Sequence, residues 1–141
     1  VVRLFGFEPK VAFVSHSTFG QPLTSRTKHI RNAVEILKEK NVDFQFDGDM
    51  QPDVALNSEY EELYPFAKIV GKANILIMPG QHSAAISYKL MKSIGDSKVI
   101  GPLLIGLGLP IEIAPLRSST SEILNLASIA AYSADVIDYQ K

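Results

Sequence analysis

The 141-residue chain contains no cysteine, which excludes a disulfide framework, a thiolate metal site and a cysteine nucleophile. It has no excess charge of one sign: the formal net charge is -1, so the composition does not favour binding to nucleic acid. No apolar run approaches about 18 residues, so no membrane-spanning segment is expected. No basic stretch followed by an apolar one opens the chain, so we expect no secretion signal and predict a cytoplasmic protein.

The composition that is present is typical of a folded globular domain, with 46% apolar and 21% charged residues. We find no internal repeat, no low-complexity stretch and no linker rich in proline, glycine or serine. The length suits one domain, so we expect residues 1–141 to form a single domain. Because the first residue is Val1 and not methionine, we expect this domain to be part of a longer protein.

Short apolar runs alternate with amphipathic segments along the chain. The apolar runs predict strands at residues 11–15, 43–47, 74–78, 102–105 and 111–113. Helical spacing of apolar residues predicts helices over 24–40 and 83–95, helical pieces over 51–64, and a last helix that follows a capping-box spacing of Ser119 and Glu122. This order predicts an α/β fold with a mostly parallel sheet and helices on both faces, a three-layer α/β/α arrangement.

Polar residues follow most of the predicted strands, at 15–18, 47–49 and 79–83, and a glycine-rich stretch follows another at 106–108. In a parallel sheet the carboxyl ends of the strands lie at one edge, and ligands bind outside that edge. Hydroxyls, imidazoles and free helix amides gathered there suit a phosphate or carboxylate. His16 and His82 fall at this edge, whereas His29 lies on the polar side of a helix and is expected to be solvated. The pattern leaves two interpretations open, ligand contact or simple capping of the following helices.

Three local patterns do not favour a nucleotide site, a catalytic serine or a metal site. The stretch 106–111 begins like a dinucleotide fingerprint but lacks the third glycine and contains Pro110, which favours a turn. No Gly-x-Ser-x-Gly elbow is present, so a catalytic Ser–His pair is not favoured. Asp47, Asp49 and Asp53 lack calcium-loop spacing, and a solvated turn followed by a helix start explains them better than a metal site.

Several strings of residues resemble the phosphotransacetylase (phosphate acetyl/butyryltransferase) family, in order and over almost the whole chain. They are Ser15-His16-Ser17-Thr18, Asp47-Gly48-Asp49-Met50-Gln51 with Asp53 and Ala55, Gly71-Lys72-Ala73-Asn74, Ile86-Ser87-Tyr88-Lys89, Ile100-Gly101-Pro102, and Gly106-Leu107 with Pro110. The resemblance implies the C-terminal fold of phosphotransacetylases, which is similar to that of isocitrate and isopropylmalate dehydrogenases.

Two further strings narrow the resemblance. Leu63-Tyr64-Pro65-Phe66 and Ala84-Ala85-Ile86-Ser87-Tyr88 resemble the phosphotransacetylase-like C-terminal region of large bacterial NADP-dependent malic enzymes. This implies upstream domains that hold NADP and a divalent metal, Mg²⁺ or Mn²⁺, and oxidatively decarboxylate malate to pyruvate. The same resemblance implies that this chain binds no cofactor and has a regulatory role, with acetyl-CoA as the effector. It also implies a homodimer that forms through this region within a larger assembly.

The chain departs from the family's catalytic pattern between the last predicted strand and the last helix. Where the family has a Ser-Arg-Gly run, this chain has Pro115-Leu116-Arg117, so the hydroxyl is lost and the guanidinium is displaced by one position. Ser93, beside Lys92, replaces another family arginine. Because acyl transfer needs a placed cation for the phosphoryl oxygens, we expect no catalytic residue in this chain.

Binding of the effector does not require the lost catalytic groups, because ground-state binding and catalysis are separable. We therefore expect an acetyl-CoA site, and the residues predicted to contact it are Ser15, Ser17, Thr18, Arg117 and Glu122, the last of which stands at the family's aspartate. Two alternatives remain. One is an active phosphate acetyltransferase that moves acetyl between acetyl phosphate and CoA, and the other is a structural assembly module without a ligand.

Overall fold

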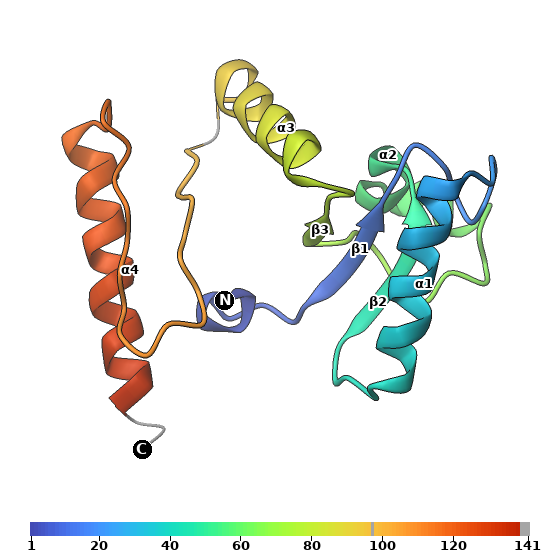
Figure 1. Cartoon of the computed structure of the whole chain (residues 1–141), viewed down its shortest axis with the longest axis horizontal. Helices are drawn as coiled ribbons and strands as arrows, with labels where there is room; N and C mark the ends of the chain where they lie inside the picture. The colour runs from blue at the N-terminus through green and yellow to red at the C-terminus, as the bar shows by residue number, and fades with distance from the viewer. Residues whose placement is uncertain (97, 139–141) are drawn as a thin grey trace. The chain divides into compact units, whose positions relative to one another are not determined.

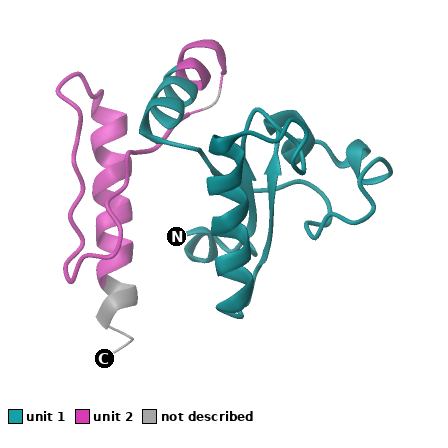
Figure 2. Cartoon of the chain, turned by 45° about the vertical axis from the view of Figure 1, so that its right-hand side comes forward, with its two compact units in different colours: residues 1–89 teal, residues 90–141 magenta. Residues whose placement is uncertain are grey.

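A computed structural model describes residues 1–96 and 98–138 of the chain (Figure 1). The chain divides into two compact units, Val1–Lys89 and Leu90–Lys141 (Figure 2). The expectation that residues 1–141 form one domain stays a prediction.

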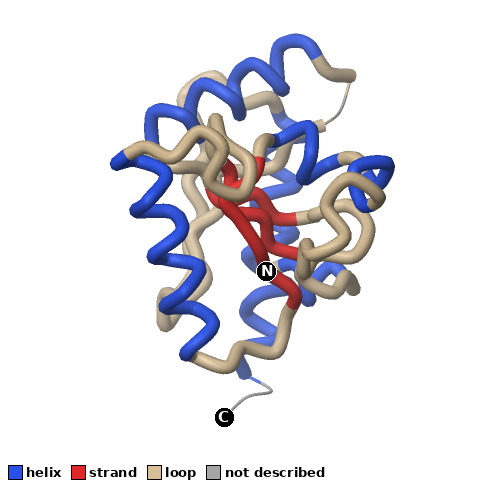
Figure 3. Tube along the Cα trace, turned by 90° about the vertical axis from the view of Figure 1, so that its right-hand side faces the viewer, coloured by secondary structure: helices blue, strands red, loops and turns tan. Residues whose placement is uncertain are grey.

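Unit 1 is built around a small parallel sheet. Its strands are β1 (Lys10–Val14), β2 (Gln45–Met50) and β3 (Ile75–Ile77), in the order β2-β1-β3. Figure 3 shows the three strands side by side with α1 (Ser25–Glu39) lying along them. The remaining elements of this unit are the 3-10 helices η1 (Val2–Phe5) and η2 (Ser58–Glu61), the short helix α2 (Pro52–Leu56), and most of α3 (Gln81–Ile94).

The strand β1 lies in the centre because it pairs in parallel with both neighbours, Val11 with Phe46 of β2 and with Ile75 of β3. Parallel strands need long crossover connections, and α1 and the α2–η2 segment supply them. The core cluster consists of Ala12, Met50, Ala55, Ile69 and Ala73. Three of these five residues are alanines, which leaves room for α2 to lie close to β1.

The helix α1 begins where the sequence predicts. Thr24 is its N-cap: the Thr27 backbone N–H donates to Thr24 Oγ1 at 3.3 Å, and the Thr24 N–H donates to Thr27 Oγ1 at 2.8 Å. These reciprocal bonds satisfy amide groups that the first turn of a helix leaves free. Further along, α1 contacts β2 and β1, and its Val34 is buried. The predicted helix over 24–40 is confirmed.

The strand β2 differs from the prediction. It runs to Met50, past the predicted end at Asp47, so the expected solvated turn at Asp47 and Asp49 is wrong. Asp47 is only 6% exposed and Asp49 is fully buried. The sequence pattern missed this because acidic residues and a glycine usually mark a turn. Here the pairing with β1 continues through Gly48, with a register irregularity between Phe13 and Val14.

Unit 2 contains the last turn of α3 and the helix α4 (Thr120–Asp138). The predicted capping box is confirmed: the Ser119 N–H donates to Glu122 Oε2 at 2.7 Å, and the Glu122 N–H donates to Ser119 Oγ at 3.3 Å. The strands predicted at 102–105 and 111–113 are wrong, since neither segment pairs into a sheet within the described residues.

The α/β fold with its parallel sheet is confirmed. The helix α3 begins at Gln81, two positions before the predicted start at Ser83. None of the helices within residues 1–96 and 98–138 is long and apolar enough to cross a membrane.

Candidate functional site

A cleft of about 650 Å³ opens at the carboxyl end of the sheet in unit 1. This volume lies within the range of small-molecule sites. Residues from the ends of β1 and β3 and from the starts of α1, α2 and α3 line it. Its polar lining residues are Ser15, His16, Arg26, His29 and Ser83, and its apolar ones are Val14, Ile30, Pro52, Met78 and Pro79.

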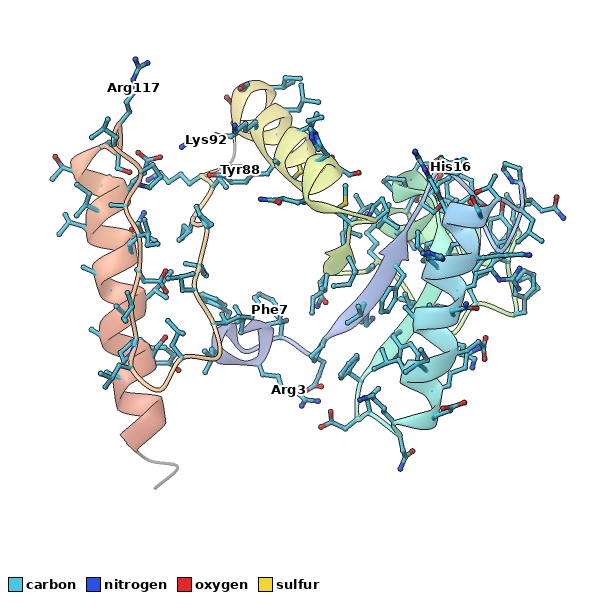
Figure 4. All side chains as sticks on the ribbon, viewed as in Figure 1. Arg3, Phe7, His16, Tyr88, Lys92 and Arg117 are labelled. Carbon is cyan, nitrogen blue, oxygen red and sulfur yellow. The ribbon has the colours of Figure 1, made fainter. Side chains whose placement is uncertain are left out.

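The loop after β1 supplies Ser15 and His16 to the cleft and is held in place by its own hydrogen bonds. The Ser15 N–H donates to the Met50 carbonyl at 2.9 Å, which extends the pairing with β2 by one residue. The Ser17 N–H donates to Ser15 Oγ at 3.2 Å. At the C-terminal end of the loop, the Gln51 N–H donates to Thr18 Oγ1 at 3.2 Å. Figure 4 shows His16 at the carboxyl end of β1.

The structure brings together three of the predicted site residues, Ser15, Ser17 and Thr18, in this one loop. All three are buried, and of them Ser15 lines the cleft. Thr18 uses its hydroxyl to position Gln51 at the start of α2, so part of its contribution is to the loop itself. Contact of these residues with a ligand stays a prediction.

The histidines agree with the prediction in part. The sequence predicts that His29 is solvated, and it is exposed; in addition it lines the cleft. His82 is exposed and is absent from the cleft lining, whereas its neighbour Ser83 is part of it. Arg26 also lines the cleft and is not among the site residues that the sequence predicts. Its position three residues before His29 places both side chains on one face of α1, but only the structure shows that this face meets the cleft.

Asp49 lies beside this loop with a fully buried carboxylate. Within the described residues neither of its oxygens has a hydrogen-bond partner, and the same holds for the buried Ser17 hydroxyl. The Arg31 Nε lies 4.0 Å from Asp49 Oδ1. The absence of a side chain at Gly20 makes room for this arginine, because a Cβ there would overlap its guanidinium. Within the described residues, the ion-pair contact of Asp49 is therefore with Arg31, whose side chain is half exposed on α1.

Asp47, on the same strand, is paired differently. Its Oδ1 accepts the Gly48 N–H at 2.9 Å and its Oδ2 accepts the Lys68 N–H at 2.7 Å. This carboxylate therefore ties β2 to the segment that follows η2. In the part of the chain that the structure describes, no group of three or more histidine, aspartate or glutamate side chains could hold a metal ion.

The other two predicted site residues, Glu122 and Arg117, belong to unit 2. Lys92 Nζ donates to Glu122 Oε1 at 2.6 Å. This bond is the largest of the causes that lower the pKa of Glu122 to about 2, and bonds from the Ser119 backbone and hydroxyl add to it. Glu122 is thus an ionised carboxylate already engaged with Lys92 and with the cap of α4.

Arg117 lies in a turn before α4, which the Ser118 N–H closes by donating to the Pro115 carbonyl at 2.9 Å. Its side chain is exposed and extends away from α4 (Figure 4). Contacts of Arg117 and Glu122 with a ligand stay predictions.

A protein-family model described as "Phosphate acetyl/butaryl transferase" matches residues 1–131. The chain is 47% identical over 134 residues to an NADP-dependent malic enzyme of Rhizobium meliloti, with 95% of this chain covered and 18% of that protein. It is 35% identical over 133 residues to a phosphate acetyltransferase of Clostridium acetobutylicum, with 94% of this chain and 40% of that protein covered.

Among solved structures, the chain matches a phosphotransacetylase from Streptococcus pyogenes with a TM-score of 0.86 and 34% identity. That match covers 94% of this chain and 41% of the other. The chain therefore spans less than half the length of these phosphotransacetylases and about a fifth of the malic enzyme.

Proposed function

Because the chain belongs to the phosphate acetyl/butaryl transferase family, we propose that it is the regulatory end of an NADP-dependent malic enzyme and that it helps this enzyme to sense acetyl-CoA. The identity of 47% to the malic enzyme, against 35% to the phosphate acetyltransferase, supports the choice of parent protein. The observation that carries the sensing role is the cleft at the carboxyl end of the sheet, where Ser15, His16 and Arg26 offer polar groups to an anionic ligand.

The upstream part of the parent protein, in this proposal, oxidises malate with NADP and a divalent metal. This chain contributes an effector site and no cofactor ligands. The hydroxyl groups of Ser15 and Ser83 bind and orient the ligand, and the apolar side chains of Ile30 and Met78 exclude water from its less polar part.

Loss of acyl-transfer chemistry is part of the same proposal. At the turn before α4, Pro115 and Leu116 carry neither a hydroxyl nor a cation, and the guanidinium of Arg117 extends from the next position. An acyl transfer without placed donors loses several kcal/mol of transition-state stabilisation, about 3–4 kcal/mol for a single donor. Ligand binding persists without transfer because it depends on contacts in the ground state.

The test uses the intact parent enzyme and a variant that fills the cleft. Ser83→Trp places an indole in the lining, so we expect the acetyl-CoA concentration that half-inhibits malate oxidation to rise by about tenfold or more. Ser58→Trp is the matched control, because Ser58 is exposed at the start of η2 and lies outside the cleft lining. Unchanged inhibition of Ser83→Trp would rule out this cleft as the sensor.

An active phosphate acetyltransferase is the second candidate, favoured by the 35% identity to the Clostridium acetobutylicum enzyme. Thiol release from acetyl-CoA in phosphate buffer separates the two functions. We expect no release by the intact protein, and turnover close to that of a dedicated phosphate acetyltransferase would contradict the regulatory proposal. A structural module without a ligand would show no shift in melting temperature when acetyl-CoA is added.

A further inference from the structure

The lining of the cleft in unit 1 includes three side chains that carry N–H donors, Arg26, His29 and His16. Arg26 and His29 come from the first two turns of α1, and His16 comes from the loop after β1. Arg26 and His29 are three positions apart, so their side chains lie on the same face of α1. No acidic side chain is among the cleft's lining residues in the described part of the chain. The three groups therefore line the same cavity with N–H donors, and no carboxylate of the described residues lines it beside them.

The apolar part of the cleft lining restricts the class of ligand. Val14, Ile30, Met78 and Pro79 line the cleft with apolar groups. A simple inorganic anion has no apolar part that could pack against such a surface. An organic phosphate has both a charged end and a less polar body. A guanidinium donates two parallel hydrogen bonds to a phosphoryl group, and an imidazole donates at least one in either protonation state.

We propose that Arg26, His16 and His29 form a phosphate-binding subsite that takes the phosphoryl groups of a nucleotide-containing thioester. The inference rests on the proposed function, since it assigns the phosphoryl groups of the CoA moiety to these three side chains of the cleft. In this proposal Ser15 and Ser83, which also line the cleft, contact the part of the ligand nearer to the thioester. Affinity at this subsite depends on the phosphoryl groups and not on the acetyl group.

The experiment measures binding to the intact parent protein by calorimetry with acetyl-CoA and with S-acetylpantetheine, which lacks the nucleotide and its phosphates. Arg26→Gln removes the guanidinium and keeps a hydrogen-bonding side chain. We expect it to weaken acetyl-CoA binding by about 10- to 100-fold, the effect of losing a charge-assisted hydrogen bond. Binding of S-acetylpantetheine should change by less than about twofold.

Lys28→Gln is the matched control. Lys28 is an exposed cation on the first turn of α1, and it lies outside the cleft lining. It tests whether any loss of positive charge on this helix reduces affinity through long-range attraction. Equal weakening by Lys28→Gln and Arg26→Gln overturns the subsite. Equal weakening of acetyl-CoA and S-acetylpantetheine by Arg26→Gln also overturns it, because the arginine would then only support the shape of the cleft.

Two further ligands separate failure of the subsite from failure of the proposed function. Adenosine 3′,5′-bisphosphate carries the phosphates without a thioester, and inorganic phosphate carries neither base nor thioester. One outcome supports the subsite and contradicts acetyl-CoA sensing. In it the protein binds the bisphosphate as tightly as acetyl-CoA, and Arg26→Gln abolishes the binding of both ligands. Binding of inorganic phosphate as tightly as the bisphosphate, or binding of neither, overturns the subsite.

Discussion

At the scale of single residues, the two carboxylates on β2 show how differently the same side chain is accommodated. Asp47 accepts two backbone hydrogen bonds, one with each carboxylate oxygen. Asp49 has no hydrogen-bond partner within the described residues, and Arg31 lies at 4.0 Å. Because a buried charge left alone is costly, the position of Arg31 over Gly20 is tied to the burial of Asp49.

Glu122 gives a prediction at the same scale. Its pKa is lowered from 4.5 to about 2, so the ionised form stabilises the folded protein above about pH 4.5. This stability is lost as the pH falls from about 4.5 towards 2, because protonation removes the acceptor for Lys92 and Ser119. We expect Lys92→Met to raise the pKa of Glu122, since Lys92 is the largest cause of the shift.

The measurement is an NMR titration of the Glu122 carboxyl carbon in the original protein and in Lys92→Met. Ser121→Ala serves as control, because Ser121 is an exposed neighbour in the first turn of α4. The same titration midpoint in the original protein and in Lys92→Met would contradict the assignment.

At the scale of secondary-structure elements, the β1–β2 pairing depends on Gly48. Its φ is +153°, and a Cβ at this position would lie 2.7 Å from both the Cβ and the carbonyl oxygen of Phe13. The backbone of β1 cannot move away without breaking its pairing with β3. We therefore expect Gly48→Ala to lower the free energy of unfolding by about 2–3 kcal/mol, the combined effect of overpacking and backbone strain.

Urea unfolding of Gly48→Ala and of Gly80→Ala provides the comparison. A Cβ at Gly80 would meet nothing within 4 Å, so that variant controls for the general effect of replacing a glycine. Equal stability of the two variants would show that β1 and β2 are further apart than the structure places them.

The elements also show which parts of the chain were predictable. The start of α1 at Thr24 and the cap of α4 at Ser119 were predicted because each is decided by residues within one helical turn. The segments at 102–105 and 111–113 were predicted as strands and are not. An apolar run specifies only a preference for burial, and a strand also needs a neighbour with which to form hydrogen bonds.

At the scale of the whole molecule, self-association stays a prediction. The last helix is apolar on more than one side, and Ile123 and Leu124 are 49% and 62% exposed. A twofold-symmetric interface is the commonest way to bury such surface. We expect equilibrium sedimentation of the protein at micromolar concentration to show a dimer, and Leu124→Glu to shift it towards the monomer. Ser121→Glu adds the same charge at another exposed position of α4 and is expected to leave the dimer intact.

The sequence by itself determined the family, the α/β class and the edge of the sheet where polar side chains gather, because these depend on the order of residues and on local periodicity. Only the tertiary structure decided that Asp49 is buried under Arg31 and that Arg26 and His29 turn towards the cleft with His16. The reason is physical. Which side of a helix or strand meets the sheet, and which polar groups become buried together, is set by packing between segments far apart in the chain, and no local pattern encodes that contact.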